Sequence, residues 1–332
     1  MNIRMWGKAL QVIPRISKEE WDGLDVISKW LIAVRAAVLI MTFLSAAIAG
    51  ILAIQAGKFN FWLWLPLVIG LVMAHATNNL INDYTDFVRG VDQDNYYRAQ
   101  YGPQPLVHGL LNKRQLIQYA VITGLIAVAC GAILIYARGG YTLLLMGLGA
   151  FFVLFYTFPL KYIALGEVAV LVVWGPLMIG GGYYVITGEW DWLVVLASLP
   201  YALGVTGVIF GKHIDKIEMD RERGIRTLPV LLGDRISRYT VIGMFLMQYL
   251  LVVYLVIASY FTLVTLVVFL AIYGLFRILP MFLNPKPEKK PDDYPDVWPN
   301  WYVAGAFYHN RQFGMLYLIG LMLNAVLVHL FL

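Results

Sequence analysis

Long apolar runs separated by short polar segments dominate this chain. About nine runs occur, at residues 30–54, 61–81, 116–136, 141–158, 165–186, 192–210, 239–257, 261–282 and 313–332. A helix needs about 20 apolar residues to cross ~30 Å of hydrocarbon, and most of these runs reach that length. Within lipid, the N–H and C=O groups of each segment must pair internally, so each run is predicted to be helical. The pattern predicts an all-α polytopic membrane protein.

The segments outside these runs are short and charged. Residues 1–29 carry several charges and lack the apolar core and cleavage site of a signal peptide, which favours a cytoplasmic interfacial helix. Residues 30–332 are predicted to form one integral-membrane domain. Within it, residues 283–312 hold several prolines and charges, so we expect an irregular cytoplasmic loop there.

Composition and charge placement narrow the class further. With 60% hydrophobic and 14% charged residues and a mean hydropathy of +0.71, the chain is not a soluble domain. Of the 25 Lys and Arg residues, only Lys58 and Arg138 fall in the loops opposite the N-terminus, and Arg35 and Arg277 lie within the predicted spans. The positive-inside rule therefore predicts that the N-terminus and both acidic clusters lie on the cytoplasmic side of the membrane and that the C-terminus lies on the opposite side. This distribution points to membrane lipids as partners and argues against nucleic acid.

The first acidic cluster continues the second apolar run. At about 100° per residue, one polar stripe collects His75, Asn78, Asn79, Asn82 and Asp86, with Asp83 to one side. Such a stripe must face the bundle interior or a water-filled cavity. Asn82 and Asp86 lie one turn apart and can present oxygens to one Mg²⁺ ion. The alternatives are a solvated, capped helix end and, for His75, a hydrogen-bonded interior histidine.

The second acidic cluster follows the sixth run and is less regular. Asp215 and Glu218 share one helical face, whereas Asp220 projects well over 100° away. Asp215 and Asp220 can therefore converge on one ion only if the helix ends or bulges between them. Otherwise one of them acts from outside the coordination sphere. Two carboxylate clusters in an apolar bundle indicate divalent metals that hold a polyanion, and diphosphate is the favoured polyanion.

Two cations accompany these acids. Arg35 falls inside the first predicted span, where an arginine is a functional candidate that needs an anionic partner. Lys161 closes the fourth span, where its ammonium can supply a point charge to a phosphate or anchor the helix at the interface.

Three segments together resemble the UbiA superfamily of intramembrane polyprenyl transferases. Residues 82–92 (Asn-Asp-Tyr-Thr-Asp-Phe-Val-Arg-Gly-Val-Asp) are similar to its first aspartate-rich motif, in the form of the naphthoate (menaquinone) branch. Residues 215–233 are similar to the second motif, and residues 156–167 to a third conserved segment. One departure concerns the second motif, where the family usually has an aspartate at the position of Lys216 and here the acid is displaced to Asp215.

The resemblance implies a bundle with a cytoplasm-facing cavity and a Mg²⁺-dependent reaction. A polyprenyl group would pass from an isoprenoid diphosphate to an acceptor, an aromatic ring such as 1,4-dihydroxy-2-naphthoate in quinone biosynthesis. The implied metal ligands are Asn82, Asp86, Asp92, Asp215, Glu218 and Asp220, of which Asp86, Asp215 and Asp220 are catalytic. The implied substrate-binding residues are Arg35, Tyr156, Lys161, Lys212 and Arg226.

Other functions keep part of this picture. The same fold could act on a non-aromatic lipid alcohol or cyclise a prenyl diphosphate, and the sequence does not separate these chemistries. A transporter is the alternative of a different class. It would be expected to scatter its carboxylates at mid-membrane depth on several helices, whereas here they gather at the ends of two.

Overall fold

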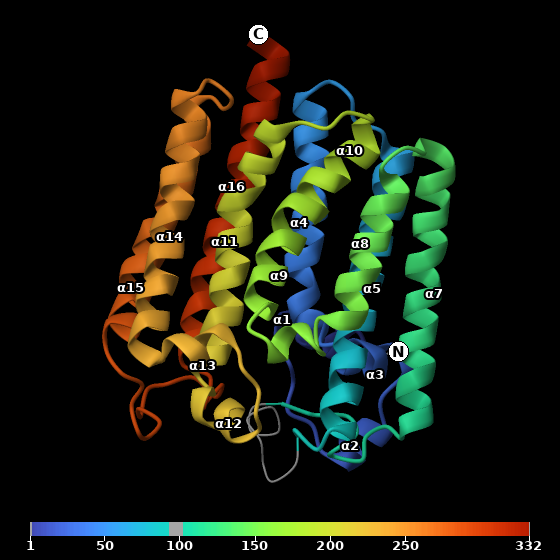
Figure 1. Cartoon of the computed structure of the whole chain (residues 1–332), viewed down its shortest axis with the longest axis vertical. Helices are drawn as coiled ribbons and strands as arrows, with labels where there is room; N and C mark the ends of the chain where they lie inside the picture. The colour runs from blue at the N-terminus through green and yellow to red at the C-terminus, as the bar shows by residue number, and fades with distance from the viewer. Residues whose placement is uncertain (1, 93–101, 332) are drawn as a thin grey trace.

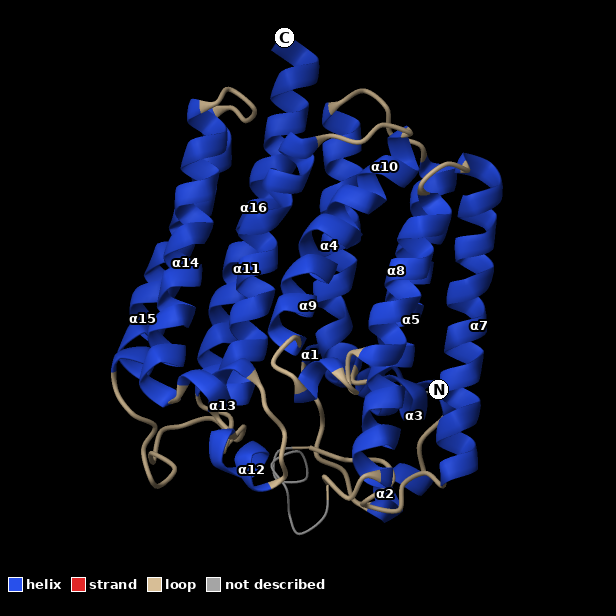
Figure 2. Cartoon of the chain, viewed as in Figure 1, coloured by secondary structure: helices blue, strands red, loops and turns tan. Residues whose placement is uncertain are grey.

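The structure, a computed structural model, describes residues 2–92 and 102–331, and its regular elements are all helical (Figure 2). The long helices are α4 (Ala36–Gln55), α5 (Phe61–Val88), α7 (Lys113–Arg138), α11 (Trp192–Ile214), α14 (Asp234–Ile257) and α16 (Tyr302–Phe331). Two further spans are built from consecutive pieces. One joins α9 (Gly166–Val172), the π-helical η2 (Val173–Gly180) and α10 (Gly181–Thr187), and the other joins the 3₁₀ helix η3 (Leu263–Ala271) and α15 (Ile272–Leu283).

Within the described residues, eight helices are long and apolar enough to cross a membrane. A ninth apolar helix, α8 (Thr142–Phe155), has 14 residues and is shorter. The predicted all-α class with eight to nine apolar helices is therefore confirmed.

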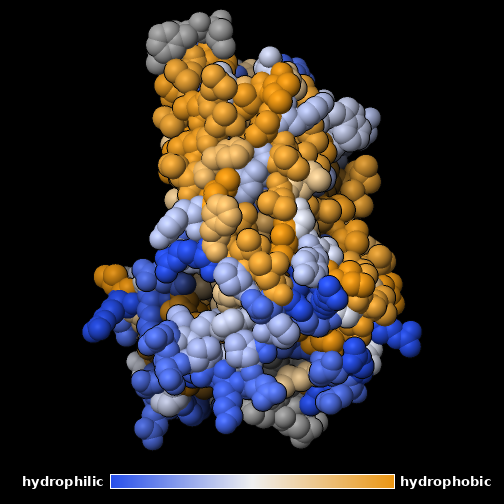
Figure 3. Space-filling view, turned by 90° about the vertical axis from the view of Figure 1, so that its left-hand side faces the viewer, coloured by the Kyte–Doolittle hydropathy of each residue, from blue (hydrophilic) through white to orange (hydrophobic). Residues whose placement is uncertain are grey.

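The long helices run side by side along the long axis of the molecule, and the short helices gather at one end (Figure 1). These are α1 (Ile3–Gln11), α2 (Lys18–Asp22), α3 (Val26–Ala33), α12 (Ile217–Glu222) and α13 (Leu228–Leu232). We call this the polar end, because hydrophilic side chains cover it on the face shown in Figure 3, while hydrophobic side chains dominate the rest. The last helix, α16, runs to the opposite end.

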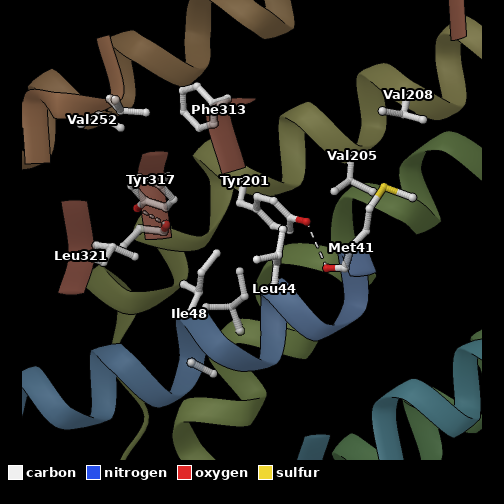
Figure 4. Close-up of a cluster of buried hydrophobic side chains, with 14 of the residues drawn as sticks. Met41, Leu44, Ile48, Tyr201, Val205, Val208, Val252, Phe313, Tyr317 and Leu321 are labelled. Carbon is white, nitrogen blue, oxygen red and sulfur yellow. Dashed lines mark hydrogen bonds between the residues drawn. The ribbon is translucent and has the colours of Figure 1, made fainter. Parts of the chain in front are cut away.

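The core lies where α4, α11, α14 and α16 meet (Figure 4). Leu44, Ile48, Val252 and Leu321 are buried there together with aromatic side chains. The Tyr201 hydroxyl donates to the Met41 carbonyl at 3.1 Å, a bond that ties α11 to α4. Because lipid gives no hydrophobic drive between helices, packing and such hydrogen bonds hold the bundle together.

Two predicted boundaries differ in the structure. The first run breaks at Arg35, whose φ of 57° separates α3 from α4, so this arginine lies at the entrance of the span and not inside it. The last helix begins at Tyr302 and not near residue 313, so the irregular loop covers residues 284–301. His309 and Asn310 had interrupted the apolar pattern, but both are buried inside the bundle.

Candidate active site

The first acidic motif lies on α5, which continues as a helix to Val88. Asn82 and Asp86 therefore remain one turn apart, and the Asn82 amide donates to the Asp86 carboxylate at 3.2 Å. The same amide reaches the Thr157 hydroxyl at 3.2 Å. His75 shares a 2.7 Å hydrogen bond with Thr42 through Nδ1. The predicted polar stripe is thus interior, and His75 is a hydrogen-bonded core histidine.

Lys161 joins the loop after α8 to the first motif. Its ammonium lies 2.8 Å from Oδ1 and 2.9 Å from Oδ2 of Asp86, and the lysine is only 4% exposed. It belongs to the short helix η1 (Leu160–Tyr162). A snorkelling anchor would place its ammonium in the interface, so the structure favours the point-charge interpretation over the anchor.

Arg35 finds the anionic partner that its burial requires. Its Nη2 atom lies 3.3 Å from the Asp83 carboxylate and donates to the Asn79 carbonyl at 2.9 Å. A longer contact of 3.4 Å reaches Asn82 Oδ1. The left-handed backbone at Arg35 thus turns a buried guanidinium toward the acidic stretch of α5.

The second motif contains the helix break that the sequence left open. Helix α11 ends at Ile214, and α12 begins at Ile217. Lys216, in the break, places its ammonium 2.8 Å from Asp220 Oδ1, and Asp220 is fully buried. The motif therefore presents a buried lysine–aspartate pair.

Asp215 has a different place from the one predicted. Its carboxylate accepts the backbone N–H groups of Trp301, Tyr302 and Val303 at 2.9, 3.2 and 3.0 Å, at the start of α16. Lys286 Nζ lies 3.3 Å away. Burial raises the pKa of this carboxyl, while Lys286 and the three N–H groups act to lower it. These contacts assign Asp215 to capping α16, which argues against its predicted roles as a metal ligand and a catalytic residue.

Glu218 is also directed away from the site. Its side chain is 75% exposed and pairs with Arg221 at 2.7 Å on the surface of α12. A metal ligand at this position would require the side chain to leave that pair and to turn inward. Of Asp215, Glu218 and Asp220, the structure therefore leaves Asp220 as the candidate that is neither held by the α16 backbone nor exposed.

The two motifs meet through the loops that follow them. Val91 and Ile225 form a small buried cluster, with Tyr162 and Met219 packed against it. Arg223 Nη1 donates to the Gly90 carbonyl at 2.8 Å, which adds a polar link between the same loops. An isolated bridge pairs the backbones of Ile163 and Arg226. The sequence predicted that the motifs converge, but not these contacts.

The remaining predicted residues are spread around this meeting point. Tyr156 and Lys212 line a cavity, whereas Arg226 is exposed and contributes through its backbone. Asp92 is buried, and its Oδ2 accepts from Gln104 Nε2 at 2.8 Å.

Two buried contacts were not predicted from the sequence. Gln104 also donates to the Asp83 carbonyl at 3.1 Å, and an isolated glutamine gives no signal of such a role. His213 Nδ1 and Glu167 Oε1 are 2.5 Å apart and fully buried. Glu167 lies in the segment 156–167 that resembles the family, and His213 lies two residues before the second motif. This proximity was the available clue to the pair.

A cavity of about 1270 Å³ opens beside the motifs. Its polar lining includes Arg35, Asn78, Asn82, Tyr156 and Lys212. The deeper lining is apolar and comes from α5, α7, α8 and the span formed by α9, η2 and α10, including Leu71, Ala127, Met146, Ala150 and Val173. A ligand that fits this cavity would have one anionic end and a long apolar tail.

The residues of the first motif fit a hard divalent ion in kind. Asn82 and Asp86 offer an amide oxygen and a carboxylate, and Mg²⁺ is commonly held by one or two carboxylates, water and substrate phosphates. Among residues 2–92 and 102–331, no group of three or more His, Cys, Asp or Glu could hold a metal alone. In the second motif Asp215 and Glu218 have other partners and only Asp220 is left beside Lys216, so these three acids do not form a ligand set for an ion of their own.

The fold and the site define a multi-pass membrane protein with buried cations and carboxylates at one end of an apolar cavity. The chain belongs to the UbiA prenyltransferase family, whose sequence profile matches residues 43–326. It is therefore an enzyme of that family, and the transporter interpretation is set aside.

Curated relatives carry the same family name. UbiA prenyltransferase domain-containing protein 1 of Rattus norvegicus is 28% identical over 183 residues, which is 53% of this chain and 52% of the relative. The match thus spans about half the length of that relative. The Gallus gallus protein of the same name is 24% identical over 284 residues, or 83% of this chain and 79% of the relative.

Solved structures share the fold at low identity. A UbiA homolog from Aeropyrum pernix K1 is 19% identical, with a TM-score of 0.63 over 85% of this chain and 96% of that one. A UbiA homolog from Archaeoglobus fulgidus bound to GPP and Mg²⁺ is 16% identical, with a TM-score of 0.55 over 88% and 99%. A structure from work on digeranylgeranylglyceryl phosphate synthase gives a TM-score of 0.59 at 17% identity over 90% and 98%.

Proposed function

We propose that this chain transfers a polyprenyl group from an isoprenoid diphosphate to an aromatic acceptor of the 1,4-dihydroxy-2-naphthoate type. The observation that carries the proposal is the buried Asp86–Lys161 pair beside Asn82, which lines a cavity of about 1270 Å³ with largely apolar walls, together with the contact between the loops of the two motifs. The family membership and the Archaeoglobus fulgidus homolog bound to GPP and Mg²⁺ support the donor class.

The polar side chains in and near the cavity supply the positive charge that a diphosphate needs. Lys161 and Lys216 present ammonium groups, and Arg35 and Lys212 line the cavity itself. Asn82 and Asp86 would hold Mg²⁺, which when bound supplies charge neutralisation to the diphosphate oxygens. Charge-assisted hydrogen bonds from the lysines stabilise the same oxygens as negative charge develops on them.

The reaction breaks the bond between the prenyl C1 and the diphosphate oxygen, and the electron pair leaves with the diphosphate. A ring carbon of the acceptor then bonds to C1, and that carbon loses its proton. Tyr156 and Trp174 line the cavity, and their ring faces can stabilise the allylic cation that forms. The apolar walls keep water from the cation, so transfer competes well against hydrolysis.

The acceptor rests on the similarity of residues 82–92 to the naphthoate branch. The chain's similarity to a structure from work on digeranylgeranylglyceryl phosphate synthase makes a lipid alcohol the second candidate, and a cyclised prenyl product is the third. For the orientation, the placement of Lys and Arg supports a polar end on the cytoplasmic side, with the C-terminus opposite.

An acceptor screen tests the proposal. Membranes that contain the full chain are incubated with Mg²⁺, labelled geranylgeranyl or farnesyl diphosphate, and a panel of acceptors. The panel holds 1,4-dihydroxy-2-naphthoate, 4-hydroxybenzoate, homogentisate, a chlorophyllide and a glyceryl phosphate. We expect label in the prenylated naphthoate ring. Label only in glyceryl phosphate would refute the aromatic acceptor, and label only in a cyclised hydrocarbon would refute transfer.

A further inference from the structure

The second acidic motif holds two buried carboxylates that have separate partners. Asp215 binds the backbone at the start of α16, and Glu218 faces solvent beside Arg221. Asp220 is fully buried against Lys216. A second divalent ion would therefore have a single carboxylate from the motif, where the sequence had predicted a ligand pair.

Lys216 already neutralises that carboxylate. Its Nζ atom is 2.8 Å from Asp220 Oδ1, and the two side chains are 5% and 0% exposed. The break after α11 makes this contact possible, because Lys216 and Asp220 become the i and i+4 positions of a new turn. An ammonium in contact with a carboxylate repels a divalent cation, and further ligand oxygens are needed to offset that repulsion. In the first motif Asn82 offers such an oxygen one turn from Asp86. In the second motif Asp215 and Glu218 have other partners, so neither is placed to do so for Asp220.

The two lysine–aspartate pairs flank one meeting point of the loops, because Tyr162, which follows Lys161, and Met219, which precedes Asp220, pack against the same Val91–Ile225 cluster. Burial raises the pKa of the Tyr162 hydroxyl, and the charges of Lys161 and Lys216 both act to lower it. Both lysines are therefore within electrostatic reach of one hydroxyl. Tyr162 packs against the Val91–Ile225 cluster where the loops of the two motifs meet.

We infer that Lys216 takes the place of a second divalent ion. Prenyl diphosphate then binds with one divalent ion at Asn82 and Asp86 and with the ammonium groups of Lys161 and Lys216. An ammonium has three donors and a fixed charge, which suits it to phosphate oxygens as a point charge. The inference rests on the proposed function, since it concerns how the donor substrate is held.

Metal stoichiometry tests the inference directly. The purified full chain is titrated with Mn²⁺ in the presence of geranylgeranyl S-thiolodiphosphate, a donor analogue that resists ionisation, and bound Mn²⁺ is counted by electron paramagnetic resonance. We expect one Mn²⁺ per chain. In Lys216→Met, the count stays at one and the analogue binds at least tenfold more weakly. In Lys216→Asp, which restores an acid at this position, a second Mn²⁺ binds.

Lys58→Met is the matched control, because Lys58 pairs with Glu189 and does not line the cavity. It should change neither the count nor the analogue affinity. Two Mn²⁺ in the unmodified chain, unchanged affinity in Lys216→Met, or a count of one in Lys216→Asp would each overturn the inference. The count in the unmodified chain does not depend on how well a variant folds. An unmodified chain that binds no analogue would contradict the proposed function itself.

Discussion

The contacts of Asp215 predict a defect of stability for its substitution, separate from any defect of chemistry. Asp215→Ala removes the acceptor of three backbone N–H groups at the start of α16 and leaves Lys286 without this carboxylate. Loss of an N-terminal cap costs about 0.5–2 kcal/mol, and buried hydrogen bonds to a charged group about 1.5–3 kcal/mol each. These costs overlap, so we expect a loss of about 3 kcal/mol in the free energy of unfolding, which is above the range for a cap alone and at the upper end of the range for one buried hydrogen bond to a charged group.

The assay separates the two interpretations of this residue. For a chain of this size, about 3 kcal/mol corresponds to a fall in Tm of roughly 6 °C in detergent. Asp215→Asn keeps one acceptor oxygen and should cost about 1 kcal/mol. Both variants should retain prenyl transfer when they are assayed well below Tm.

Glu218→Ala is the control from the same motif, because Glu218 is exposed and makes only a surface pair. It should leave both Tm and activity unchanged, since exposed pairs contribute little. If Asp215→Ala kept its Tm but lost activity, Asp215 would be a metal ligand or catalytic residue after all, and the capping argument would be wrong.

Four further outcomes follow from the site and the cavity. Asp86→Ala should lower turnover at least a hundredfold, because Lys161 and the implied metal site both lose this carboxylate. A variant that is folded by size exclusion and still transfers radiolabel would contradict this. Gly149→Leu should shorten the prenyl chain that the enzyme accepts, because Gly149 lines the cavity and a side chain added there would enter open space. Competition between geranyl and geranylgeranyl diphosphate measures this preference. Gly147→Leu is the control and should not change it, because Gly147 lies outside the lining. EDTA should leave the Tm of the ligand-free protein unchanged. Burial raises the pKa of the Asp215 carboxyl above its unfolded value. The stability advantage of the unmodified chain over Asp215→Asn should therefore be greatest below pH ~4 and should shrink as the pH rises through the folded pKa. The difference in Tm between the two proteins measures this advantage.

Hydrophobic patterning was sufficient for the fold, because a span in lipid has a fixed length and must be helical. Periodicity also placed Asn82 and Asp86 on one face, since a regular helix fixes the angle between residues. Patterning failed where the backbone leaves a regular helix. The left-handed turn at Arg35 and the break at Lys216 depend on tertiary contacts that no local period reveals.

The partner of a charged side chain could be predicted only where few groups of opposite charge were available to it. An arginine buried near acids had to find one of them, and Arg35 binds Asp83. Asp215 was predicted to be a metal ligand, and its contact with α16 could not be predicted because that helix begins at Tyr302, far along the chain. The polar residues His309 and Asn310 hid that start, because they are buried by tertiary packing within an otherwise apolar helix.

The pairing of charges changes the meaning of the acidic motifs. From sequence alone, buried carboxylates in a lipid-embedded bundle are expected to require metal ions for their stability, since an unpaired buried charge is very costly. In the structure the chain supplies its own cations: Arg35 for Asp83, Lys161 for Asp86 and Lys216 for Asp220. We therefore expect the fold not to depend on metal, and under the proposed function a divalent ion would serve to hold the diphosphate. For the same reason the polar end is already organised before substrate binds, because each lysine is held in place by its carboxylate and little reorganisation is needed when phosphate oxygens arrive.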